Sequence, residues 1–222
     1  WSGDVHSSFR ALREQVQAGI SMGLAGIAWW TTDVGGFLGG YPEDEGFQEL
    51  LVRWFEWAVF CPVLRMHGAR QPFEELEQIW RDGVKQFTSG QPNEIYSYGE
   101  RVFRILKKYL LIRDSLREYL LTLMKEAHET GIPLMRALFL VYPEAAGSWE
   151  AEDEYLLGRD ILVAPVTEAG QRQKAVYFPG EEIWISAADR TPYRGGSRAV
   201  VEAPLDKIPV FVRKGAGIEF TV

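Results

Sequence analysis

The sequence has little of several features that mark particular classes of protein. Cys61 is the only cysteine among 222 residues, which excludes an internal disulfide, and its apolar neighbours predict a buried structural thiol. No apolar run approaches the ~20 residues that a membrane-spanning helix needs, and no signal-peptide pattern opens the sequence. We therefore expect a soluble protein with no membrane partner, and we favour a cytoplasmic location, although no targeting signal assigns one.

Basic residues are scarce relative to acidic ones. Lys and Arg number 24 against 31 Asp and Glu, which gives a formal net charge of −7. Because nucleic acids are bound through clusters of cations, and none outweighs the acids here, we expect no nucleic-acid partner. The patterns H-E-x-x-H, C-x-x-C and G-x-S-x-G are absent, as are phosphate-binding glycine loops. We expect a neutral ligand, no metal and no cofactor.

What is present indicates a globular chain whose first part is of the α/β type. Hydrophobic residues make up 46% of the sequence, enough for the core of one large or two small domains. Short apolar runs typical of buried parallel strands alternate with helical periodicity. The expected order is helix 8–20, strand 23–31, helix 46–57, strand 61–66, helix 98–113 and helix 115–129. Gly131 is expected to end the last helix, and Trp29 and Trp30 are interpreted as core.

The pattern changes near residue 132. Beyond it, short strand-like runs separated by Pro, Gly and Asp are typical of an antiparallel sandwich. These runs cover residues 134–141, 160–165, 173–178, 182–185, 198–203 and 209–212. We therefore place one domain at 1–132 and a β-sandwich domain at 133–222. Residues 68–97 are expected to form a long polar loop with a helical stretch at 73–80, and the charged stretch 150–154 a solvated helix turn.

Polar side chains follow the two predicted strands. Asp33 and Phe37 come after the first strand and His67 after the second, which is where α/β folds carry their ligand-binding side chains. His67 alone is equally compatible with a hydrogen-bonded core histidine. Asp4 lies ahead of the first helix, where a turn or a helix cap is the simpler interpretation of an isolated S-G-D.

Three motifs occur in a set order: W-S-G-D at residues 1–4, D-V-G-G-F at 33–37 and R-M-H-G at 65–68. Together they resemble the second half of the catalytic barrel of glycoside hydrolase family 31, the α-glucosidases and α-xylosidases. The run Y-L-L-G-R-D-I-L-V-A-P-V at 155–166 resembles the sandwich that follows this barrel. Because a complete barrel needs ~250 residues, the resemblance implies the C-terminal portion of a (β/α)8 TIM barrel followed by an antiparallel β-sandwich.

The resemblance also implies a role for each motif residue. Asp4 matches the general acid/base of a retaining glycosidase, an enzyme that uses two carboxyl groups about 5–5.5 Å apart. The other matches form the sugar-binding site: Trp1, Asp33, Phe37 and His67. Arg65 lies two residues before His67 on the same face of the predicted strand, which places it to pair with Asp33.

The nucleophilic carboxylate of this family lies upstream of the matched motifs. The resemblance therefore predicts that the 222 residues alone are inactive, and that the parent protein is a retaining α-glycosidase acting on an oligosaccharide or another α-glycoside. Its partners would include the missing N-terminal part of the same protein, and a homo-oligomer is compatible with the sequence.

Other functions stay open at this point. The family implies α-glucosidase, α-xylosidase, transglycosylase and sulfosugar-directed activities, although Ser2 and the run W-W-T-T-D at 29–33 look closer to bacterial α-xylosidase-like members. The competing hypothesis is a non-catalytic carbohydrate-binding or structural module. Such a module needs exposed aromatic side chains on a strand face, for which Tyr177, Trp184 and Tyr193 are the candidates. Packing in the core is the simpler interpretation of these three residues.

Overall fold

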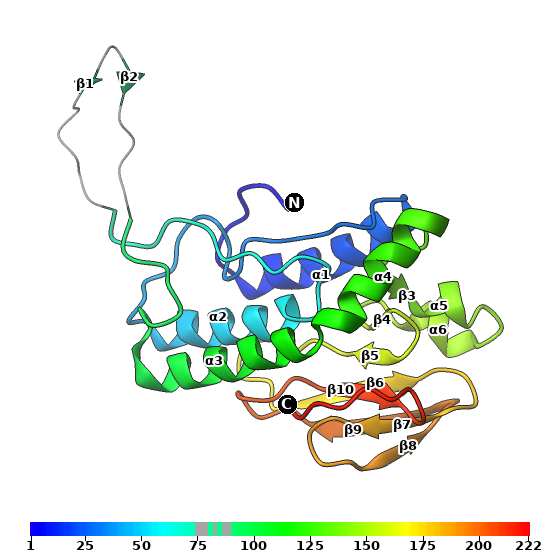
Figure 1. Cartoon of the computed structure of the whole chain (residues 1–222). Coiled ribbons are helices and arrows are strands. Elements are labelled where there is room, and N and C mark those ends of the chain that lie inside the picture. The colour runs from blue at the N-terminus through cyan, green and yellow to red at the C-terminus, as the bar shows by residue number, and fades with distance from the viewer. Residues whose placement is uncertain (74–79, 82–83, 86–89) are drawn as a thin grey trace.

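A computed structural model describes residues 1–73, 80–81, 84–85 and 90–222. Four long helices lie above two antiparallel sheets, and the short pair β1 (Trp80–Arg81) and β2 (Val84–Lys85) projects from the rest (Figure 1). The helical stretch expected at 73–80 lies largely outside the described residues. Within the described ranges, no helix combines the length and the apolar character of a bilayer span.

Helix α1 (Phe9–Leu24) confirms the helix expected at 8–20 and continues one turn beyond it. The Ser8 hydroxyl accepts a hydrogen bond from the Ala11 amide at 3.1 Å and so caps the first turn. Leu12 and Val16 point from its apolar side into the core.

The two strands expected at 23–31 and 61–66 are not formed. Residues 27–32 have no regular secondary structure, and they contact the second segment through single hydrogen bonds such as Val63 amide to Trp30 carbonyl at 3.1 Å. Trp30 is buried but Trp29 is 54% exposed, so the assignment of Trp29 to the core is wrong. A parallel strand buried on both faces needs covering elements and paired neighbours, and the described chain pairs these segments only loosely with each other.

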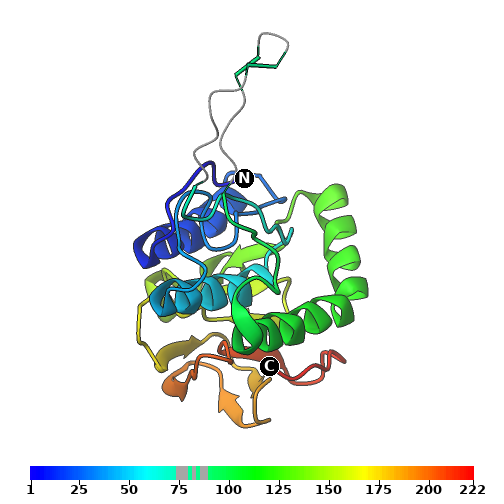
Figure 2. The ribbon, with the colours of Figure 1, turned by 90° about the vertical axis from the view of Figure 1, so that its left-hand side faces the viewer.

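Helix α2 (Glu45–Ala58) confirms the second expected helix and lies at the centre of the molecule. Every residue from 50 to 58 is buried, as expected for a helix that is enclosed on all sides. Helix α3 (Gly99–Ser115) packs beside it, and α4 (Arg117–Thr130) leaves α3 at a steep angle (Figure 2). As predicted, Gly131 ends α4, with φ of +77° and its amide bonded to the Ala127 carbonyl.

The C-terminal part contains two antiparallel sheets, as the strand spacing predicted. The larger has the order β3 (Met135–Ala137), β4 (Tyr155–Leu157), β5 (Ile161–Val163), β10 (Val210–Arg213), β7 (Ile183–Ser186), β8 (Pro192–Arg194). The smaller pairs β6 (Gln173–Phe178) with β9 (Ser197–Glu202).

Strands β3, β4 and β5 of the six-stranded sheet are buried on both faces, and alternate residues of the central strands face different layers. Tyr155 and Ile161 belong to the core shared with the helices, whereas Leu156 and Leu162 belong to the core shared with β6 and β9. The period of two along each strand explains this division. The molecule therefore has three layers: helices, the large sheet and the small sheet (Figure 1).

Several expectations for this part are corrected. Residues 138–141, expected in a strand, form the short helix α5 (Leu138–Val141), and strands β4 and β8 were not anticipated. The stretch 150–154 begins at the last residue of helix α6 (Ala146–Glu150), but it is not fully solvated: Glu154 is only 4% exposed. The charge pattern predicted that the whole stretch is solvated, but the chain turns the Glu154 carboxylate inward, where it accepts a hydrogen bond from the Tyr177 amide of β6.

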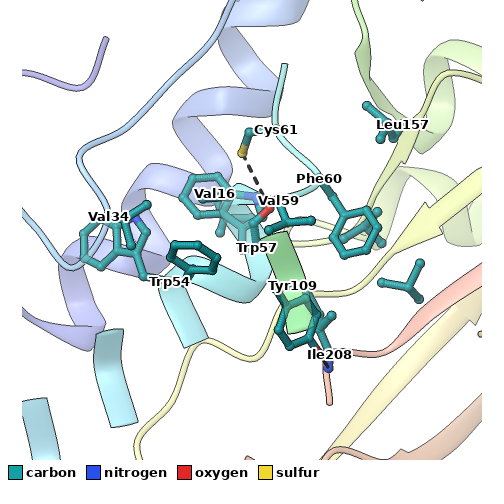
Figure 3. Packing of buried hydrophobic residues seen from close by; sticks show 14 of the residues in the cluster. Val16, Val34, Trp54, Trp57, Val59, Phe60, Cys61, Tyr109, Leu157 and Ile208 are labelled. Atoms are coloured by element: carbon teal, nitrogen blue, oxygen red, sulfur yellow. Dashed lines mark hydrogen bonds between the residues drawn. The ribbon is translucent and has the colours of Figure 1, made fainter. Parts of the chain in front are cut away.

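The helical layer and the sheets share one continuous core. Trp57, Tyr109, Leu157 and Ile208, from both parts of the chain, belong to the same cluster (Figure 3). Cys61 lies in it as a buried free thiol, as predicted, with its sulfur 3.7 Å from the Trp57 carbonyl oxygen. The division near residue 132 stays a prediction.

Candidate active site

Three segments that are distant in sequence run side by side at the predicted site. They are residues 1–7, 33–40 and 65–70, joined by parallel bridges between His6 and Leu38, Asp33 and Arg65, and Leu38 and Ala69. The middle segment is held from both sides, because the Phe37 amide donates to the Val5 carbonyl at 2.8 Å and the Ala69 amide to the Phe37 carbonyl at 2.7 Å. The fold thus gathers all three motifs at one place.

Two motif glycines permit this close approach. Gly36 has φ of +83°, and a β-carbon there would lie 2.7 Å from the Ser7 amide nitrogen. Gly68 has φ of +131°, and a β-carbon there would lie 2.7 Å from the Phe37 carbonyl oxygen. Since L side chains fit neither the space nor the backbone conformation, only glycine lets the three segments meet.

Asp33 is the buried acid of the site. Its side chain is 0% exposed, and its two carboxylate oxygens have no hydrogen-bond partner among the described residues. Arg65 Nε lies 2.9 Å from Asp33 Oδ1, which is the ion pair that the sequence predicted, although the contact lacks hydrogen-bond geometry. A buried carboxylate with free acceptor positions is costly unless a donor is supplied, so Asp33 is suited to accept hydrogen bonds from a ligand.

The electrostatics of Asp33 show that the predicted site residues lie close together. Burial raises the pKa of its carboxyl, and Arg65 and His67 oppose this because both favour the ionised form. The Trp1 side chain also lowers the pKa of Asp33, whereas the nearby charge of Asp4 raises it further. Four predicted residues therefore act on one buried carboxyl.

Aromatic groups border this acid. The rings of Phe37 and His67 lie 5.3 Å apart between centroids with an interplanar angle of 49°. The Arg65 guanidinium lies 5.3 Å from the centre of the Trp1 ring. Asp4 and His67 are exposed and Trp1 is 62% exposed, so these three side chains are accessible while Asp33 is recessed. A core position for His67, the alternative interpretation, is excluded.

Sequence reasoning did not single out Arg70. Its side chain is fully buried against the 33–40 loop and donates to backbone carbonyls there. An arginine in a polar stretch is ordinarily expected in solvent, so no local signal distinguishes it. Among the residues with described coordinates, no cluster of His, Cys, Asp and Glu is arranged to hold a metal ion.

Comparison with known proteins identifies the family of this site. Residues 1–123 match the model of the glycosyl hydrolases family 31 TIM-barrel domain, and residues 131–218 match that of the family 31 C-terminal domain. The chain belongs to glycoside hydrolase family 31. The predicted family and the predicted fold class, a part of the family 31 barrel followed by an antiparallel β domain, are confirmed.

Individual family 31 members resemble the chain over nearly its whole length. An α-xylosidase of Saccharolobus solfataricus is 36% identical over 216 residues, which is 97% of this chain and 27% of that protein. Alpha-glucosidase 2 of Bacillus thermoamyloliquefaciens is 32% identical over 218 residues, 98% of this chain and 25% of that protein. The crystal structure of a family 31 α-xylosidase from a soil metagenome, complexed with xylose, has a TM-score of 0.96 and 52% identity, covering 98% of this chain and 32% of that one. The chain thus spans between a quarter and a third of these relatives.

Proposed function

We propose that this chain supplies the acid/base carboxylate and part of the sugar-binding site of a retaining family 31 α-glycosidase that removes terminal α-xylosyl or α-glucosyl residues. The observation that carries the proposal is Asp33, a fully buried carboxylate without a hydrogen-bond partner in the described chain, recessed beside the exposed carboxylate of Asp4. Sugar hydroxyls are neutral donors that satisfy such a group without adding charge.

The proposed chemistry assigns each group a step. Asp4 donates its proton to the glycosidic oxygen while a second carboxylate attacks the anomeric carbon, so that the glycosidic bond breaks and a covalent glycosyl-enzyme forms. Asp4, now ionised, takes a proton from water, and this water displaces the enzyme carboxylate with net retention. The nucleophilic carboxylate would come from a part of the protein outside these 222 residues.

The binding groups are divided between polar and apolar contacts. Asp33 accepts from sugar hydroxyls, Arg65 favours the ionised form of Asp33 through the 2.9 Å ion pair, and His67 is exposed. Phe37, half-buried and 5.3 Å from the His67 ring, offers an apolar surface to the C–H face of the sugar.

An α-xyloside is the first candidate substrate. The 52% identity to the α-xylosidase that was crystallised with xylose supports it, and the lower identity to Alpha-glucosidase 2 keeps an α-glucoside as the second candidate. The competing carbohydrate-binding module finds no support in its proposed residues. Trp184 and Tyr177 are buried, and Tyr193 stacks on Phe178 at 4.6 Å.

The test uses a protein that contains this chain together with a whole barrel, assayed with 4-nitrophenyl α-xyloside and α-glucoside. We expect Asp4→Ala to lower turnover by about 10²-fold to 10⁴-fold, the range of general acid–base catalysis. Azide should restore part of this loss and yield a glycosyl azide of retained configuration, because azide needs no base. Asp114→Asn, which changes an exposed carboxylate of α3, is the matched control. Normal turnover by Asp4→Ala would reject the assignment.

A second measurement addresses the chain by itself. The 222 residues should release no 4-nitrophenol from either glycoside, because the proposed mechanism needs a second carboxylate. Turnover that survives Asp4→Asn would contradict both this inactivity and the role of Asp4.

A further inference from the structure

Arg70 is a fully buried cation at the centre of the three site segments. Its Nη2 donates to the Val34 carbonyl at 2.9 Å, and its Nη1 donates to the Gly36 carbonyl at 2.9 Å and the Gly39 carbonyl at 3.1 Å. Nη1 also lies 3.5 Å from the Ser7 hydroxyl. One side chain from the third segment therefore contacts both of the others.

The Nε side of the Arg70 guanidinium is also held by hydrogen bonds. Its Nε lies 3.1 Å from Asn93 Oδ1 and 3.1 Å from the Tyr98 hydroxyl, and the Tyr98 hydroxyl in turn donates to Asn93 Oδ1. All six of these partner oxygens, on Ser7, Val34, Gly36, Gly39, Asn93 and Tyr98, are neutral. The planar fork of a guanidinium has the donors to serve several carbonyls at fixed angles, which a lysine ammonium lacks.

The segment that Arg70 holds needs an external support. Its glycines at 35, 36, 39 and 40 all have φ between +80° and +100°, and glycine has the largest backbone freedom to lose on folding. The same segment carries Asp33 at its start and Phe37 in its middle. Three of its carbonyls accept hydrogen bonds from the one Arg70 guanidinium.

We propose that Arg70 is the positioning residue of the sugar-binding site: it does not contact the sugar, but it fixes the loop that presents Asp33 and Phe37. This inference rests on the proposed function, in which Asp33 binds the sugar. A displacement of about 1 Å at such a site costs on the order of 10²-fold in rate. Substitution of Arg70 should therefore weaken substrate binding and lower turnover by the folded protein, and not only lower its stability.

Arg53 provides a matched control for this role. It is also fully buried and donates to backbone carbonyls, those of Ala203 at 2.6 Å and Gln171 at 3.0 Å among them, but these lie in the β-sheet part of the chain. Arg53→Lys thus removes the same kind of support away from the site, whereas Arg70→Lys removes it at the site.

The first measurement needs no enzymatic activity. In hydrogen–deuterium exchange of the folded 222-residue chain, Arg70→Lys should speed exchange of the Phe37 and Leu38 amides at least about tenfold, while Arg53→Lys leaves them unchanged. Equal exchange of these amides in Arg70→Lys and the unsubstituted chain would overturn the proposal, whatever the enzyme acts on.

The second measurement uses the active protein with a whole barrel. Arg70→Lys should raise KM at least about fivefold, whereas a purely structural loss lowers only the active fraction and leaves KM unchanged, as expected for Arg53→Lys. Because Arg70 acts through both Asp33 and Phe37, Arg70→Lys should raise KM by a smaller factor in the Asp33→Asn variant than in the unsubstituted enzyme. If Asp33→Asn leaves KM unchanged, the proposed function fails; if it raises KM and Arg70→Lys does not, only the present inference fails.

If Arg70→Lys fails to fold, a milder pair of variants tests the positioning role of Arg70. Tyr98→Phe removes one partner of the guanidinium at the N-cap of α3. Tyr109→Phe removes a buried hydroxyl within α3, away from the site, which accepts a hydrogen bond from the Ile208 amide at 3.0 Å. Tyr98→Phe should raise KM about twofold to threefold relative to Tyr109→Phe. Equal KM values in the two variants would reject the positioning role.

Discussion

Glu154 makes the stability of this protein depend on pH, and Glu154→Gln tests this. The side chain is 4% exposed, and its two oxygens share the Tyr177 amide at 3.2 and 3.1 Å. Burial raises the pKa of this carboxyl from 4.5 to about 8, a shift that the Tyr177 amide opposes and the neighbouring Asp153 increases. The folded chain therefore holds a proton on Glu154 that the unfolded chain has already lost.

The sign and the size follow from this difference. Between the unfolded pKa of 4.5 and the folded pKa of about 8 the folded state binds more protons, so the free energy of unfolding falls as pH rises through this window. From about pH 5 to about pH 9 the fall caused by Glu154 amounts to about 4 kcal/mol, at 1.36 kcal/mol per pKa unit. Glutamine does not titrate. The free energy of unfolding of Glu154→Gln, relative to that of the unsubstituted chain, should therefore rise by about 4 kcal/mol between about pH 5 and about pH 9.

Urea unfolding followed by near-ultraviolet circular dichroism at pH 5, 7 and 9 measures the effect. The quantity to compare is the difference in free energy of unfolding between the two chains, because the contribution of Glu56, whose pKa burial raises to about 7, is common to both and cancels. Glu181→Gln, at an exposed position, is the control and should show no pH-dependent difference. A difference for Glu154→Gln that is the same at pH 5 and pH 9 would refute the reasoning.

Three further predictions concern packing. Arg53→Met should lower the free energy of unfolding by about 3–5 kcal/mol in urea, because it leaves the buried Glu56 without its cation 3.1 Å away. Gly36→Ala should destabilise by about 1–3 kcal/mol, with a lowered thermal midpoint, because its methyl group meets the Ser7 amide in a left-handed backbone conformation. Burial raises the pKa of the Cys61 thiol, so Ellman's reagent should label the chain only as fast as it unfolds.

The site was predicted in part from the pattern and in part from the resemblance. Asp33, Phe37 and His67 follow apolar runs, and this placement indicated ligand contact without further knowledge. Asp4 looked like a helix cap, and only the order of the three motifs indicated an acid. The expected ion pair between Arg65 and Asp33 is present, because residues that end neighbouring parallel segments meet at one edge.

Other expectations failed where local pattern and tertiary surroundings disagree. Apolar residues 23–31 have the composition of a buried strand, but Trp29 is exposed because strand formation depends on neighbours that the run itself does not specify. Residues 138–141 have strand-like composition and form a helical turn after β3. In both cases a strand was predicted from the composition of the run alone, which does not specify the neighbouring segments that a strand needs.

The sequence by itself determined features that depend on near neighbours: the positions of helices α1 and α2 and the end of α4 at Gly131. Only the tertiary structure decided which charged side chains are buried. Arg53 is bonded to a carbonyl 150 residues away, Arg70 to one 36 residues away and Glu154 to an amide 23 residues away. A buried charge is stable only where such distant groups converge on it, and no local pattern records that convergence.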